Sequence, residues 1–166
     1  TRSDAHIVDR IAALARAFRP DLTADERHPV IAIDADERAR ADSAWGDGGE
    51  RVLVNVSAGT SERLWPEDRY AAVMRHIRDL APTAILRVIA APTDAERAER
   101  IARSGGGTFV KTASLRDALA LVATADFVFT PDTSIAHATS AFRKPSVAIY
   151  GRGSRATWAL YGAPGV

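Results

Sequence analysis

The chain has 166 residues, of which 46% are hydrophobic and 26% charged, and its formal net charge at pH 7 is +1. This composition is that of a globular domain of ordinary size, which excludes a disordered chain, and the near-zero charge gives no support to nucleic-acid binding. The absence of cysteine excludes disulfides and thiolate nucleophiles or metal ligands, and no apolar run approaches the ~20 residues of a membrane-spanning helix.

The first 48 residues carry short elements. Four large apolar residues recur at helical spacing: Ile7, Ile11, Leu14 and Phe18. They predict a helix that ends before Pro20. The sequence HPVIAID at 28–34 predicts a short strand, and ADERARADSAW at 35–45 predicts a charged helix.

The clearest loop signal is GDGG at 46–49. We therefore expect the main domain boundary there. Residues 1–48 would form a segment that packs on a main domain formed by 49–166.

From Arg51 onward, strand-like and helix-like segments alternate. The predicted strands are short and nearly all apolar: 51–56, 84–90, 108–110, 126–130 and 146–150. The predicted helices carry apolar residues at helical spacing: 66–80, 94–104, 114–125 and 133–142. Strands of this kind are buried on both faces in parallel sheets. The alternation predicts a Rossmann-like, doubly wound α/β domain with right-handed crossovers.

Ligands bind such sheets outside the carboxyl ends of the strands, where the strand order reverses. The loop SAGTSERLWP after the first strand offers small residues and hydroxyls: Ser57, Gly59, Thr60 and Ser61. Such residues let a backbone approach a phosphate, and Arg63 could add a charge-assisted contact. The loop has neither of the two common glycine-rich phosphate-binding patterns.

The segment PDTSIAHATS after the fourth strand combines an acid, hydroxyls and an imidazole. A helix that begins near Thr133 would point its first N–H groups and its dipole at an anion. The side chain of His137 would project toward Thr133 and this anion position, because helical side chains point toward the N-terminus of the helix. Alternatively, Asp132 is simply the N-cap of the helix, and Thr133 and Ser134 are ordinary first-turn residues.

A ribose-binding acid commonly follows the second strand of a nucleotide-binding unit. Here the sequence APTDAER makes Asp94 the first candidate and Glu96 the second, although Asp94 could equally serve only as a helix cap. The four histidines have no metal-ligand spacing, so we expect no metal site: His6, His28, His76 and His137.

Three stretches resemble the carboxyl-terminal lobe of family 9 glycosyltransferases, the lipopolysaccharide heptosyltransferases. They are VLVNVSAGTSERLWPEDRYAAV, SLRDALALVATADFVFTPDTSIAHATSAFRKPSVAIYG and TWALYG, and together they cover about 51–162. The segment PDTSIAHATSAFRKPSVAIYG matches the family pattern D-T-G-x-x-H-x-A-A-x-x-x-P, and S-x-R-L-W-P matches its K-x-W-P region.

The resemblance implies one lobe of a GT-B fold, in which two Rossmann-like lobes face each other across a cleft. It implies binding of a nucleotide sugar, usually ADP-L-glycero-D-manno-heptose, and inverting transfer without a metal or other cofactor. It assigns to the diphosphate Asp132, Thr133, Ser134, Ile135 and His137. It assigns to the phosphate loop Ser57, Gly59, Thr60 and Ser61. Arg63 would stabilise the leaving nucleoside diphosphate, and Asp94 would bind the ribose.

The resemblance also implies a partner, a lipid A–Kdo-type acceptor bound by an amino-terminal lobe that carries the acidic general base. This lobe is absent from the sequence, and the start at Thr1 without a signal pattern leads us to expect a piece of a longer protein. We expect no catalytic base in this chain and no turnover by it alone. The full enzyme would be cytoplasmic, with peripheral association at the inner face of the inner membrane.

Three departures from the family pattern leave the donor sugar open. Ser134 replaces the usual Gly, Arg63 replaces Lys, and GRGSRATW at 151–158 replaces the usual G-P-T-D-P. Two alternatives therefore remain beside the heptosyltransferase lobe. One is a GT-B transferase that uses a UDP- or GDP-sugar, and the other is a non-catalytic nucleotide-binding or partner-docking domain.

Overall fold

The computed structural model describes residues 5–23, 25–60, 64–151, 155–162 and 164. Its centre is a five-stranded parallel sheet with the strand order β3-β2-β1-β4-β5. The strands are β1 (Arg51–Asn55), β2 (Ile85–Ile89), β3 (Thr108–Phe109), β4 (Phe127–Pro131) and β5 (Ser146–Ile149). The chain winds outward from β1 to β3 and then returns to β4, so the order reverses between β1 and β4. The predicted Rossmann-like, doubly wound α/β sheet is confirmed.

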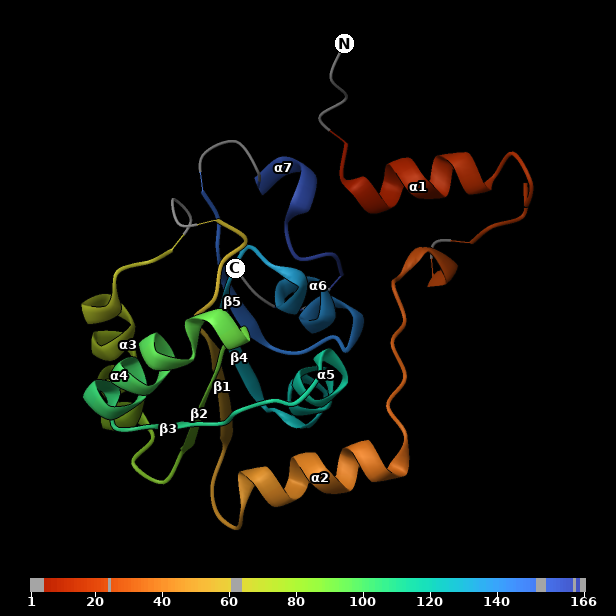
Figure 1. The fold of residues 1–166 in the computed structure, drawn as a ribbon. Coiled ribbons are helices and arrows are strands. Elements are labelled where there is room, and N and C mark those ends of the chain that lie inside the picture. The colour runs from red at the N-terminus through yellow and green to blue at the C-terminus, as the bar shows by residue number, and fades with distance from the viewer. Residues whose placement is uncertain (1–4, 24, 61–63, 152–154, 163, 165–166) are drawn as a thin grey trace.

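Helices cover both faces of the sheet (Figure 1). The α-helices of the described residues are α1 (Ile7–Ala15), α2 (Ala35–Trp45), α3 (Glu67–Leu80), α4 (Ala95–Gly105), α5 (Leu115–Thr124), α6 (Ser134–Ala141) and α7 (Arg155–Trp158). One face carries α3 and α4, and the other carries α5 and α6 with α2 packed beneath α5. Among the described residues, none of these helices has the length and apolarity needed to cross a bilayer.

The alternation of side chains along β1 divides the core into two halves. Val52 and Val54 belong to the half that includes Tyr70 and Met74 of α3, while Leu53 belongs to the half beneath α5. All five side chains are at most 4% exposed. Burying one such apolar side chain stabilises the fold by about 1.5–3 kcal/mol, so this short strand is held from both sides.

The glycines at the end of α4 let α3 and α4 approach closely. A Cβ atom on Gly105 would lie 2.7 Å from Met74 Sδ, well inside van der Waals contact. Gly106 caps the end of α4 with φ +73°, a left-handed conformation that glycine adopts without steric cost. Gly106 therefore ends α4, and the missing side chain of Gly105 leaves room for Met74 in the core.

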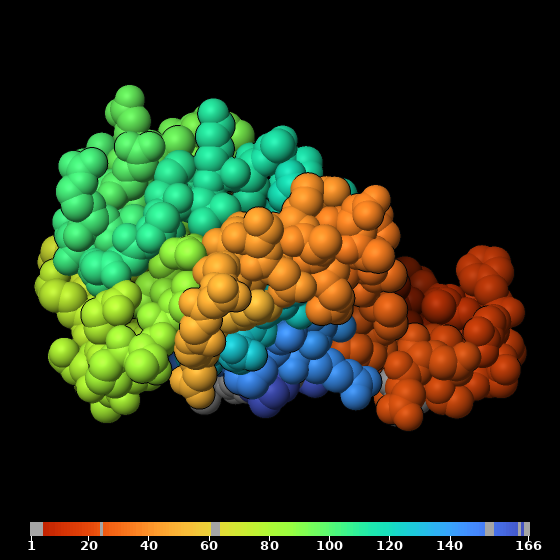
Figure 2. All heavy atoms as spheres, turned by 90° about the horizontal axis from the view of Figure 1, so that it is seen from below, coloured from red at the N-terminus to blue at the C-terminus, as the bar shows by residue number. Residues whose placement is uncertain are grey.

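Two predictions for the N-terminal segment were wrong in part. The helix ends at Ala15, so Phe18 lies beyond it, and Ile11 and Leu14 are 59% and 72% exposed. Residues 28–34 form no strand, because no sheet edge pairs with them; Ile31 and Ile33 pack instead against the core beneath α5, while Val30 is exposed. Figure 2 shows residues 5–27, in red to orange, projecting from the side of the body.

Helix α2 is anchored by a buried hydrogen bond. Trp45 is 1% exposed, and its indole N–H donates to Thr124 Oγ1 of α5 at 2.8 Å. Thr124 Oγ1 in turn donates to the Ala120 carbonyl at 2.8 Å. The helix predicted at 35–45 is thus confirmed and packs on α5, while the domain boundary expected at 46–49 stays a prediction.

Replacing Thr124 by valine should lower the free energy of unfolding by about 1–3 kcal/mol, because the buried Trp45 N–H loses its only hydrogen-bond acceptor among the described residues. The matched control is Thr139→Val. Thr139 is also buried, but its hydroxyl only donates to the Ile135 carbonyl. Removing this hydroxyl leaves no buried donor without an acceptor, so the substitution should cost less. Urea denaturation of both variants measures the difference, and equal costs would contradict this role of Thr124.

Candidate functional site

A pocket of about 380 Å³ lies at the carboxyl ends of β1 and β2, beside the point where the strand order reverses. Its polar lining comes from the end of β1, from the loops after β1 and β3, and from the start of α6: Asn55, Ser57, Thr112, Ser114, Thr133 and Ser134. Its apolar lining includes Ile89, Leu115, Ala118 and Ile135. The volume lies in the range of pockets that hold small molecules and cofactors, about 300–1,000 Å³.

Asn55 joins the strands on either side of the order reversal. It ends β1 and is 2% exposed. Its side-chain amide donates to Thr130 Oγ1 of β4 and to Thr133 Oγ1, both at 3.0 Å, and its Oδ1 accepts from the Ser57 N–H at 3.3 Å. A buried amide is costly unless it is paired, so this network fixes the start of α6 relative to the loop after β1.

The N-cap of α6 is Thr133, which corrects the alternative that Asp132 caps the helix. Thr133 Oγ1 accepts from the Ile135 N–H at 3.3 Å, while the Asp132 backbone N–H donates to the Ile149 carbonyl at 2.9 Å. The hydroxyl can cap the helix because Asn55 holds it from the other side. Aspartate and threonine both cap helices well, so the sequence alone could not decide between Asp132 and Thr133.

Ser57 fastens the loop after β1 to the end of β2. Its Oγ accepts from the Ala91 N–H at 2.7 Å. This bond lies at the pocket, because both residues line it. Ser57 was predicted to serve the phosphate loop, and in the unliganded geometry its hydroxyl oxygen already has one partner.

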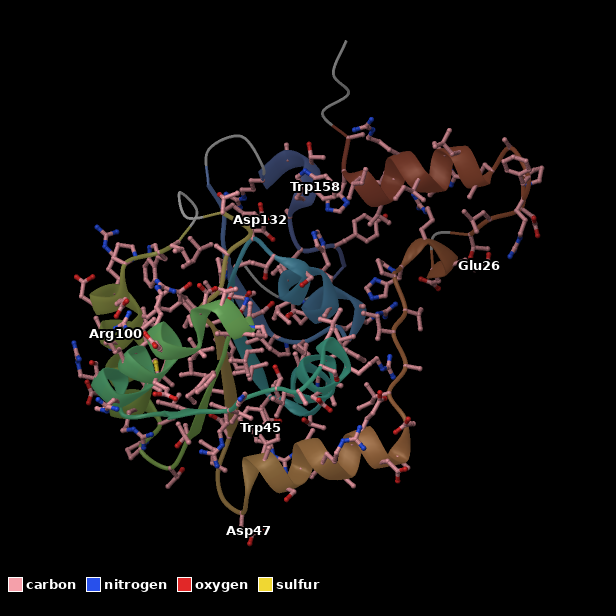
Figure 3. All side chains as sticks on the ribbon, viewed as in Figure 1. Glu26, Trp45, Asp47, Arg100, Asp132 and Trp158 are labelled. Atoms are coloured by element: carbon pink, nitrogen blue, oxygen red, sulfur yellow. The ribbon has the colours of Figure 1, made fainter. Side chains whose placement is uncertain are left out.

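His137 is half-buried on α6, and its ring packs edge-to-face against Trp158 with the centroids 5.8 Å apart. Burial lowers the pKa of His137 below its usual value near 6.5; Asp132 opposes this shift and His6 adds to it. At pH 7 the ring is therefore neutral, with one donor and one acceptor nitrogen. Asp132 and Trp158 lie at the same end of the sheet (Figure 3).

The structure brings together only part of the predicted site. Four predicted residues line the pocket: Ser57, Thr133, Ser134 and Ile135. Five others do not line it: Gly59, Thr60, Asp94, Asp132 and His137. Asp94 occupies the N-cap position of α4 but makes no side-chain capping bond, and the neighbouring Pro92 lines the pocket. Ser61 and Arg63 lie outside the described residues.

Sequence reasoning missed three residues of this region. Asn55 and Thr130 are polar residues inside otherwise apolar strands, RVLVN and FVFTP, which is a signal for a buried hydrogen bond. Their pairing depends on β1 lying next to β4, which the sequence order alone does not reveal. Trp158 had no local signal, because its contact with His137 joins α7 to α6.

A family model described as "Glycosyltransferase family 9 (heptosyltransferase)" matches residues 1–164. Lipopolysaccharide heptosyltransferase 1 of Escherichia coli K12 is 29% identical over 108 residues, which make up 63% of this chain and 33% of that protein. The chain therefore spans about a third of the length of the curated relatives that it matches.

Two solved structures show a similar fold. The family 9 glycosyltransferase of Veillonella parvula DSM 2008 matches with a TM-score of 0.84 and 20% identity, over 100% of this chain and 50% of that one. The E. coli heptosyltransferase WaaC, solved with ADP, matches with a TM-score of 0.62 and 23% identity, over 71% of this chain and 37% of that one. The fold is that of one lobe of these larger proteins.

The lowered pKa of His137 should make the chain less stable in mild acid. Below pH 6.5 the unfolded chain binds this proton more readily than the folded chain, so the free energy of unfolding contributed by this group falls as the pH drops through that value. NMR titration of the imidazole should give a midpoint below 6.5, and His137→Gln should flatten the pH dependence of unfolding. A midpoint above 6.5 would contradict the burial argument.

Proposed function

The chain belongs to glycosyltransferase family 9, and we propose that it is the donor-binding lobe of an inverting heptosyltransferase. The reaction would transfer heptose from ADP-heptose to the lipopolysaccharide inner core. The observation that carries this proposal is the pocket of about 380 Å³ at the carboxyl edge of the sheet, onto which the N-terminus of α6 opens through Thr133 and Ser134.

The lining of the pocket suits the two ends of a nucleoside diphosphate. The first turn of α6 favours an anion, because its N–H groups and dipole present positive charge, so we place the diphosphate near Thr133 and Ser134. The apolar part, with Ile89, Leu115 and Ala118, would take the base. Asp94, one residue before α4, would take the ribose. The related WaaC structure contains ADP, which supports an adenine nucleotide.

Transfer builds negative charge on the departing β-phosphate while the sugar becomes oxocarbenium-like. A helix N-terminus aimed at that phosphate stabilises the transition state more than the ground state. The proposed donation from His137 to the same oxygen atoms stays a prediction, because its ring packs against Trp158 and does not line the pocket. The predicted role of Arg63 as leaving-group stabiliser stays a prediction, since this residue lies outside the described part of the chain.

The remaining parts of the activity belong to the rest of a longer protein. The relatives are about three times the length of the matched region, so we place the general base and the lipid A–Kdo-type acceptor site in a second lobe. A cytoplasmic enzyme, peripherally bound at the inner face of the inner membrane, would meet this acceptor. No metal or other cofactor enters the proposed transfer.

Calorimetric titration of the chain with ADP, UDP and GDP tests the donor assignment. We expect ADP to bind most tightly. Ser134→Glu should weaken ADP binding tenfold or more, by an order-of-magnitude Coulomb argument, because a carboxylate at the start of α6 repels the diphosphate. The substitution suits the helix itself, because acidic residues stabilise a first turn.

Two controls separate this effect from others. Ser134→Ala removes the hydroxyl without adding charge and should weaken ADP binding much less than Ser134→Glu. Ser43→Glu adds the same charge on an exposed position of α2 and should bind ADP within about twofold of the wild type. A preference for UDP or GDP would assign another donor class. Absence of binding by a folded chain to all three nucleotides would overturn the proposal and favour a docking domain that kept only the fold.

A further inference from the structure

The guanidinium of Arg97 donates hydrogen bonds to both ends of the connection between β1 and α3. Arg97, on the first turns of α4, donates through Nη1 to the Val56 carbonyl and through Nη2 to the Trp65 carbonyl. Val56 directly follows β1, and Trp65 lies just before α3. The two nitrogen atoms of a planar guanidinium can bridge two acceptors at a fixed separation, which the single nitrogen of a lysine side chain does not reproduce.

Arg97 is held in place by its surroundings. Its side chain is only 12% exposed, and Nε lies 3.7 Å from Glu67 Oε1. Its guanidinium carbon lies 5.5 Å from the centre of the Tyr70 ring, within the range of a cation–π contact. The guanidinium of Arg97 is therefore largely buried and makes its contacts with two backbone carbonyls, Glu67 and Tyr70. We infer that Arg97 acts by holding the backbone rather than by touching a ligand.

The same residue connects two loops of the candidate pocket. Val56 precedes Ser57, which lines the pocket and accepts a hydrogen bond from the Ala91 N–H after β2. Asp94 lies three residues before Arg97 at the start of the same helix. The bond from Arg97 to Val56 therefore sets where the loop after β1 lies relative to the start of α4.

We propose that Arg97 is a positioning residue for donor binding: it fixes the loop after β1 and the start of α4 in the spacing that a nucleoside diphosphate requires. This inference rests on the proposed function, because it assumes that the pocket binds the donor. Arg97 supplies no proton and touches no reacting atom. Its contribution is to keep the pocket in its binding geometry before the ligand arrives, which reduces the ordering cost of binding.

The test compares Arg97→Lys and Arg97→Met with the wild type and with Arg100→Met. Arg100 is the matched control, because it lies on the same helix and pairs with the same Glu67 at 2.9 Å, but its side chain is 55% exposed and reaches no loop carbonyl among the described residues. For each variant of the 166-residue chain we would measure the thermal midpoint, the dissociation constant for ADP, and the hydrogen exchange of the backbone amides of residues 57–60.

We expect both Arg97 variants to fold, to exchange the amides of residues 57–60 about tenfold faster, and to bind ADP about tenfold more weakly, the size of effect that follows from losing a hydrogen bond to a charged group. Arg97→Lys should resemble Arg97→Met, because an ammonium cannot span both carbonyls. Arg100→Met should match the wild type in exchange and in ADP binding.

Several outcomes would overturn this role. Wild-type exchange and ADP affinity in Arg97→Lys would show that charge alone suffices, and an equal loss in Arg100→Met would indicate a general effect of positive charge on α4. Failure of both Arg97 variants to fold would make Arg97 a stability residue only. If the wild type binds no nucleotide, the proposed function fails; unchanged exchange at residues 57–60 would then refute the positioning role separately.

Discussion

The arrangement of the candidate site depends on how one buried amide is paired. Asn55 is 2% exposed and stands at the end of β1, next to the reversal of strand order. Its hydrogen bonds to Thr130 and Thr133 tie β1 to β4 and to the start of α6. An unpaired amide in this place would cost about 1–3 kcal/mol. The pairing of Asn55 therefore favours, at the same time, the neighbouring position of β1 and β4, the cap of α6 and the geometry of the pocket that Asn55 lines.

Arginine has a structural role at the ends of helices and loops in this chain. Its guanidinium groups repeatedly bind backbone carbonyls at the ends of elements. Arg87 donates to the carbonyls of Ala44 and Trp45 at the end of α2, at 2.8 and 2.7 Å. Arg97 does the same for the loop after β1. These positive charges therefore close helix and loop ends, where free carbonyls carry partial negative charge.

Local sequence patterns were sufficient for the sheet and its covering helices, because apolar strands and helical spacing report burial directly. They failed where burial did not imply strand pairing: Ile31 and Ile33 of the HPVIAID stretch at 28–34 pack against the core, but the stretch forms no strand. They identified the loops of the site but not its internal bonds. The hydrogen bonds of Asn55 could not be predicted without the strand order. The choice between Asp132 and Thr133 as the N-cap of α6 likewise required the position of the Asn55 amide.

The projecting α1 segment has a consequence for the colloidal behaviour of the chain. Ile11, Leu14 and Phe18 of this segment expose most of their side chains to water, and Val30, just beyond it, is 84% exposed. The isoelectric point near 8.2 leaves little electrostatic repulsion between molecules in neutral or mildly alkaline buffer. Near this isoelectric point almost no net charge opposes the attraction between exposed apolar surfaces. The chain on its own should therefore be most soluble at a pH well away from 8.2.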